Sequence, residues 1–136
     1  MVDEYTKKWL QKAMNDLKVV RNERAVEKEN LVTDAICFHA QQAAEKLLKA
    51  YLVKNNIEFG KTHNLKKLLN QCIGHDKKFD QLSVGDLTEY AVEIRYPDEF
   101  YIPSLKEVNE SIQIAENVKK FVFKKLGITE NDIFDK

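Results

Sequence analysis

Residues 31–54, with the sequence LVTDAICFHAQQAAEKLLKAYLVK, decide the fold that we expect for this chain. Their apolar side chains recur at helical spacing, and at about 100° per residue they cover an arc of roughly 200°. So wide an arc predicts a central helix that packs against neighbours on more than one side. The apolar positions are Ile36, Cys37, Ala40, Ala43, Ala44, Leu47, Leu48, Ala50, Tyr51 and Leu52.

Helical spacing continues on both sides of this stretch, and four Gly and two Pro leave little material for turns. Thr62 is the expected N-cap of the next helix. Ser104 and Glu107 form a full capping-box pattern, and Gly127 stands where that helix should end. We therefore predict an all-α, antiparallel up-and-down bundle of about five helices, with residues 1–136 as a single domain. The expected helices cover residues 3–27, 31–54, 63–72, 84–94 and 105–126.

The composition narrows the possible functions. Lys plus Arg and Asp plus Glu number 22 each, which argues against a general nucleic-acid coat protein. Two Cys make no disulfide framework, and no apolar run approaches the ~18 residues of a membrane span. The N-terminus lacks a signal-peptide pattern, so we expect a cytoplasmic protein. We expect no metal and no cofactor, because Cys72 and His75 lack a second close ligand pair and no phosphate-cradling Gly loop is present.

A polar row lies beside the apolar arc of the central helix. His39, Gln42, Lys46 and Lys49 follow one another at i, i+3, i+7 and i+10. Such a row can present hydrogen-bond donors to a phosphate or an acidic partner. On this feature alone, an ordinary solvated edge of an amphipathic helix is the more common explanation. Gln41 projects into the apolar arc, where an unpaired amide is costly, so we expect it to hydrogen-bond across the core or at a subunit contact.

The turn Arg95-Tyr96-Pro97-Asp98 stands where the helix over residues 84–94 should end. Pro97 favours a turn, and Asp98 can hold Arg95 in a bidentate pair. This ion pair is one explanation for the presence of Arg95 at the turn. The other is an anion site that Arg95 shares with the polar row of the central helix.

Charge is unevenly distributed along the chain. Residues 61–78 are mainly basic and residues 80–99 mainly acidic. Solvated faces of opposite sign explain this pattern, and so does a self-complementary surface that favours a homodimer.

The segment CFHAQQAAEKLLKA, residues 37–50, resembles the helix signature of HEPN domains. The pattern of Thr62, His63, Leu65, Leu68 and Leu69 resembles the segment that follows in that family. Arg95-Tyr96-Pro97-Asp98 resembles the next family landmark, and Ala13-x-x-Asp16-Leu17 resembles the first helix. The resemblance covers nearly the whole chain. It implies a bundle of about five helices, commonly dimeric, that binds nucleotides or works with a minimal nucleotidyltransferase.

The resemblance also implies a rival activity. One branch of the family consists of metal-independent ribonucleases, often toxins, in which an Arg is followed after four to six residues by a His. Arg95 matches the Arg, but positions 100–102 are Phe, Tyr and Ile, and no His follows His75. The expected general acid or base is therefore missing. Tyr101 lies near the position of a Tyr that partner transferases modify in some toxin members.

Three hypotheses follow. The first is a non-catalytic HEPN module, in a toxin–antitoxin-like pair of genes, that binds a nucleotide or a minimal nucleotidyltransferase. His39, Lys46 and Lys49 would contact phosphate, Gln42 would add a polar contact, and Tyr96 would stack on a base. The second is a ribonuclease that uses Arg95 with His39 or His63 as a displaced base. The third is a purely structural, dimeric interaction protein.

Overall fold

The computed structural model of the 136-residue chain describes residues 2–85, 87 and 102–134. Within these residues, the chain forms five α-helices and two 3₁₀ turns and contains no strand, so the all-α fold is confirmed. The helices are α1 (Glu4–Arg24), α2 (Thr33–Lys54), α3 (Leu65–His75), α4 (Leu105–Leu126) and α5 (Glu130–Ile133), and the 3₁₀ turns are η1 (Lys28–Asn30) and η2 (Lys77–Gln81).

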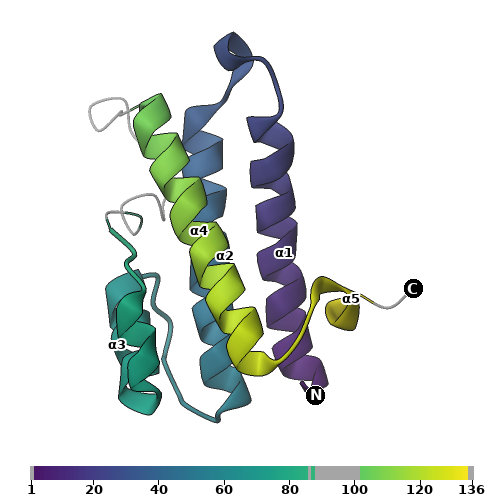
Figure 1. The fold of residues 1–136 in the computed structure, drawn as a ribbon, viewed down its shortest axis with the longest axis vertical. Coiled ribbons are helices and arrows are strands. Elements are labelled where there is room, and N and C mark those ends of the chain that lie inside the picture. The colour runs from purple at the N-terminus through teal and green to yellow at the C-terminus, as the bar shows by residue number, and fades with distance from the viewer. Residues whose placement is uncertain (1, 86, 88–101, 135–136) are drawn as a thin grey trace.

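Helix α2 lies at the centre of the bundle. It contacts α1, α3 and α4, runs antiparallel to α1, and is crossed diagonally by α4 (Figure 1). All ten apolar positions that the sequence placed on its wide arc are buried. The prediction of a central helix with neighbours on more than one side is therefore confirmed. Four alanines in this arc allow the neighbouring helices to approach closely, since a small side chain keeps the backbones near one another.

The ends of α4 follow the sequence signals. The backbone N–H of Glu107 donates to Oγ of Ser104 at 3.2 Å, and the N–H of Ser104 donates to Oε1 of Glu107 at 3.1 Å. Both halves of the expected capping box are thus formed. Gly127 ends the helix with φ of 66°, a left-handed conformation that glycine adopts without the steric cost of a Cβ.

The predicted start of α3 is wrong. Asn64, not Thr62, is its N-cap, and Oδ1 of Asn64 accepts a hydrogen bond from the backbone N–H of Lys67 at 3.1 Å. Oγ1 of Thr62 instead accepts from the N–H of Asn64 at 3.1 Å, which is a local turn contact. The backbone at Asn64 is extended, with φ of −82° and ψ of 106°, as is usual for an N-cap residue.

The helix predicted over residues 84–94 lies mostly outside the described residues. Of its expected first turn, Val84, Gly85 and Leu87 are described, and they form a turn and not an α-helix. The backbone N–H of Leu87 donates to the carbonyl oxygen of Val84 at 3.1 Å.

The segment after Gly127 docks on the bundle, which the helical spacing did not predict. Ile133 in α5 is fully buried, and Nε2 of Gln11 in α1 donates to its carbonyl oxygen at 2.8 Å. Nζ of Lys119 in α4 lies 3.0 Å from Oε1 of Glu130. These contacts tie α5 to both α1 and α4. The ion pair lowers the pKa of Glu130, mainly through the hydrogen bond from Lys119.

Both cysteines of the chain are free and fully buried, and no disulfide links them. Burial raises the pKa of Cys37 to about 11 and that of Cys72 to about 12. Both side chains are therefore uncharged thiols at neutral pH, which supports the interpretation of Cys37 as a core residue. No helix among the described residues is long and apolar enough to span a membrane.

Candidate functional site

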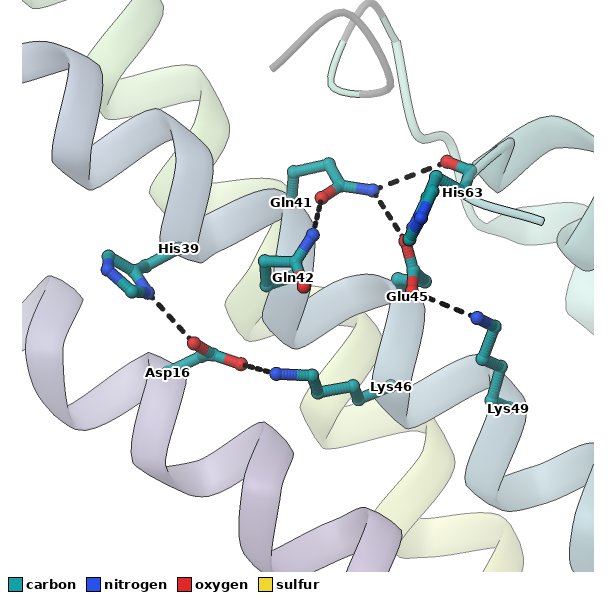
Figure 2. Close-up of polar contacts among 8 residues, drawn as sticks. All are labelled: Asp16, His39, Gln41, Gln42, Glu45, Lys46, Lys49 and His63. Carbon is teal, nitrogen blue, oxygen red and sulfur yellow. Dashed lines mark hydrogen bonds and ion pairs between the residues drawn. The ribbon is translucent and has the colours of Figure 1, made fainter. Parts of the chain in front are cut away.

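Eight polar side chains gather along one side of α2, and we refer to them as the α2 polar cluster (Figure 2). Its members are Asp16, His39, Gln41, Gln42, Glu45, Lys46, Lys49 and His63. Six of the eight lie on α2, Asp16 comes from α1, and His63 precedes α3. Two carboxylates, Asp16 and Glu45, organise the cluster.

Asp16 joins α1 to α2. It stands on the buried face of α1, three residues after Ala13 and four before Val20, and only 11% of its side chain is exposed. Its Oδ1 lies 2.8 Å from Nδ1 of His39, and its Oδ2 accepts from Nζ of Lys46 at 2.6 Å. One carboxylate therefore positions two side chains that are two helical turns apart.

His39 and Lys46 reach the surface beside each other. Their side chains are 25% and 21% exposed. Because an ionised carboxylate only accepts hydrogen bonds, Nδ1 of His39 is the protonated nitrogen of that contact, and Nε2 of a neutral ring carries the lone pair. Lys46 uses one of its three N–H donors on Asp16. Nε2 of His39 and the remaining N–H donors of Lys46 are thus available for further hydrogen bonds at the surface.

Glu45 organises the other half of the cluster from a buried position. Only 4% of its side chain is exposed. Its Oε2 accepts from Nζ of Lys49 at 3.0 Å, and its Oε1 lies 2.8 Å from Nδ1 of His63. His63 is 67% exposed, so this contact fixes the inner nitrogen of an otherwise open ring.

Lys49 is enclosed within the protein. Its side chain is 8% exposed, and besides Glu45 it lies over two aromatic rings, with Nζ 5.5 Å from the ring centroid of Trp9 and 5.4 Å from that of Phe59. An ion pair and two cation–π contacts compensate the loss of hydration. Lys49 therefore does not line an open helix edge, and it can meet a ligand only if its pair with Glu45 opens.

Gln41 hydrogen-bonds across the core, as expected from its position in the apolar arc. The residue is fully buried. Its Nε2 donates to Oε1 of Glu45 at 3.0 Å and to the carbonyl oxygen of His63 at 3.3 Å. Its Oε1 accepts from Nε2 of Gln42 at 2.7 Å. These bonds satisfy the amide and fasten α2 to the segment that precedes α3.

The polar row predicted from the sequence is therefore divided into two separate groups, and the residues within each group are linked by hydrogen bonds. His39 and Lys46 meet at Asp16, whereas Gln42 and Lys49 are linked through Gln41 and Glu45. Two lysines face two carboxylates, so the cluster has no excess charge while both histidines are neutral. The other predicted site residues, Arg95, Tyr96, Asp98 and Tyr101, lie outside the described residues.

Sequence reasoning assigned no site role to Asp16 and Glu45. A signal for each was present. Asp16 interrupts the apolar face of α1, and Glu45 stands four residues from both Gln41 and Lys49 on α2. A carboxylate on a buried face needs a partner, and a cation or an amide one turn away supplies it.

Within the described part of the chain, no group of three or more His, Cys, Asp or Glu side chains is arranged to hold a metal ion. The histidines and Lys46 give the α2 polar cluster two chemical abilities. They can donate hydrogen bonds to an anion. A histidine whose Nδ1 is held by a carboxylate can also accept a proton at Nε2.

Comparison with known proteins identifies the family. The model of the HEPN domain matches residues 6–126, which is most of the chain and includes every residue of the α2 polar cluster. No curated protein and no solved structure matches the chain. The all-helical bundle agrees with the family match. The chain belongs to the HEPN domain family.

Proposed function

We propose that this HEPN chain is a non-catalytic module that binds a nucleotide, a minimal nucleotidyltransferase partner, or both. It acts as a single domain and a homodimer in the cytoplasm, as one half of a two-gene module of the toxin–antitoxin kind. The partner part of the proposal rests on the family, whose members are often encoded beside such transferases.

One observation supports the nucleotide part. Asp16 holds His39 and Lys46 side by side, each partly exposed, with Nδ1 of His39 at 2.8 Å and Nζ of Lys46 at 2.6 Å. Lys46 keeps N–H donors for a phosphate, and Nε2 of His39 also donates when its ring carries both protons. Because Asp16 already fixes both rotamers, the two side chains lose little conformational entropy on binding. Gln42 is the adjacent polar contact in this proposal. Arg95, Tyr96, Asp98 and Tyr101 belong to the same proposed site.

Lys49 has an indirect role in this arrangement. Its ion pair with Glu45 keeps the inner half of the cluster rigid, and through Gln41 this rigidity extends to Gln42. A substitution of Lys49 would therefore mix a loss of binding with a loss of stability. Lys46 is more exposed than Lys49, so its substitution tests binding more directly.

Replacing Lys46 with Ala is expected to weaken ATP binding by about tenfold, because one charge-assisted hydrogen bond of about 1.4 kcal/mol is lost. The measurement is a fluorescence titration with a labelled ATP analogue, followed by displacement with unlabelled ATP. The control is Lys18→Ala, which removes an exposed lysine of α1 about 160° around the helix from Asp16. Equal affinities for the two variants, or no saturable binding at millimolar ATP, would refute the nucleotide part.

The second candidate function is ribonuclease activity, and His63 is the observation that favours it. Its ring is mostly exposed, and Nδ1 is held by the buried carboxylate of Glu45 at 2.8 Å. Nε2 of such a ring is oriented to act as a general base. Together with Arg95, it would replace the His that the family's ribonuclease motif lacks here.

RNA incubated with the purified protein in EDTA is expected to remain intact, because the chain lacks the motif's own His. The experiment includes Arg95→Ala, His63→Gln and the matched variant His39→Gln, whose ring is held by Asp16 in the same way. Cleavage by the natural sequence that is lost in Arg95→Ala and in His63→Gln, but retained in His39→Gln, would replace the first proposal with the second.

A further inference from the structure

A groove of about 550 Å³ lies between α4 and η2, and it shares no residue with the α2 polar cluster. Four lysines line it: Lys78 from η2 and Lys120, Lys124 and Lys125 from α4. Nζ of Lys125 lies 2.6 Å from Oδ2 of Asp76 and lowers the pKa of that carboxyl. Lys120 and Lys124 are exposed and form no ion pair with any described residue. The groove therefore carries a net positive charge.

The groove lining also has an apolar part, which we call its floor: the side chains of Leu82 and Phe121, both half-buried. Phe79 stacks on the ring of Phe121 with centroids 4.7 Å apart and planes within 11°, and Nζ of Lys125 lies 5.5 Å from the same centroid. Because these two neighbours already lie over the ring, little of its face remains for a nucleobase to stack on. An aliphatic side chain suits this floor better.

The spacing of the lysines matches an extended polypeptide. Lys120 and Lys124 are one turn apart on α4, which places their Cβ atoms about 5–6 Å apart. Alternate side chains on one face of an extended chain are about 6.6 Å apart. Two acidic residues separated by one residue can therefore each meet a lysine, with the intervening side chain directed elsewhere.

Two carboxamides complete the lining. Nε2 of Gln81 donates to the carbonyl oxygen of Lys78 at 3.0 Å, which leaves Oε1 of Gln81 as an acceptor. Oδ1 of Asn117 accepts from Nε2 of Gln113 at 2.8 Å, which leaves the Nδ2 donors of Asn117. One acceptor and one donor at the groove match the N–H and C=O groups of a peptide backbone.

We propose that the groove between α4 and η2 binds an extended acidic segment of a partner protein, with alternating carboxylates on Lys120 and Lys124 and an apolar side chain on Leu82 and Phe121. Single-stranded nucleic acid fits less well, because the lining contains no arginine and little open ring face. The overall balance of 22 basic and 22 acidic residues also disfavours it. The inference is independent of the function proposed for the α2 polar cluster.

The test is fluorescence anisotropy with a labelled peptide about ten residues long, in which Glu alternates with Ser around a central Leu. The variant with Lys120→Glu and Lys124→Glu is expected to bind this peptide about tenfold more weakly, because two attractions become repulsions. The control variant carries Lys8→Glu and Lys12→Glu, which reverses two exposed lysines at the same spacing on α1 and is expected to bind as the natural sequence does. Circular dichroism and thermal unfolding establish that both variants are folded.

Three results would overturn the inference. The first is no saturable binding of the acidic peptide, or equally strong binding of the same peptide with Gln in place of Glu. The second is an equal loss of affinity in the α1 and α4 variants, which would indicate a general charge effect. The third is displacement of the peptide by oligouridylate of equal charge at the same or a lower concentration, which would assign the groove to nucleic acid.

Discussion

Replacing Glu45 with Leu is expected to lower the free energy of unfolding by about 3–5 kcal/mol, because the substitution leaves Lys49 buried without its counter-charge. Lys49 cannot regain solvent by a simple rotation, since its ammonium group is enclosed by Trp9 and Phe59 as well as by Glu45. The measurement is urea unfolding at neutral pH, followed by circular dichroism. The midpoint should fall, while the denaturant dependence stays that of the natural sequence.

A second substitution should reverse most of this loss. Adding Lys49→Met to Glu45→Leu removes the unpaired charge, and well-packed apolar replacements of a buried ion pair are often neutral or stabilising. The matched comparison is Asp16→Leu, for which we expect a loss of only about 1–2 kcal/mol because its partners, His39 and Lys46, can turn toward water. Similar losses for Glu45→Leu and Asp16→Leu, or no recovery in the double variant, would show that the burial of Lys49 is not what makes Glu45 necessary.

Replacing Phe79 with Ala is expected to destabilise the protein by about 3–5 kcal/mol, the range for removing a fully buried aromatic ring. Phe79 is fully buried and is the main anchor of η2. It stacks on Phe121 of α4 and lies against Tyr51 of α2, with ring centroids 4.7 Å and 4.4 Å away. Its removal leaves a cavity where three elements meet. Thermal unfolding by calorimetry measures the effect.

The comparison for Phe79→Ala is Tyr5→Ala, which removes a ring of similar size that is 62% exposed. We expect this variant to change stability by no more than about 0.5 kcal/mol, as is usual for surface positions. Phe79→Leu should fall between the two, since it retains part of the apolar volume. A loss of less than about 1 kcal/mol for Phe79→Ala would mean that η2 detaches from α4 at little cost, and the lysine-lined groove would then lack a firm wall.

The central position of α2 was predictable because it follows from the residues of that helix alone. The apolar arc of residues 36–52 requires neighbours on several sides, and α1, α3 and α4 supply them. The capping box of Ser104 and Glu107 and the left-handed Gly127 were predictable for the same reason, since caps depend on residues within one turn. The choice of Asn64 over Thr62 was not, because both residues are good caps and the decision rests on the path of the chain between α2 and α3.

The candidate site was only half predictable. Helical spacing placed His39, Lys46 and Lys49 on one edge of α2, but spacing cannot say what faces a side chain from another helix. Asp16 joins His39 and Lys46 from a position 23 and 30 residues away in the sequence. Lys49 lies inside the protein because Trp9 and Phe59 cover it. These contacts exist only after α1 and the segment after α2 have packed.

The sequence by itself determined that this chain is an all-α member of the HEPN family, because hydrophobic periodicity, caps and a helix motif are properties of neighbouring residues. Only the tertiary structure decided which charges are paired and which are available. Burial of Asp16 and Glu45 fixes two histidines and two lysines, whereas Lys120 and Lys124 remain exposed on α4. The physical reason is that the energy of a charge depends on its distance from other charges and from water, and folding sets both.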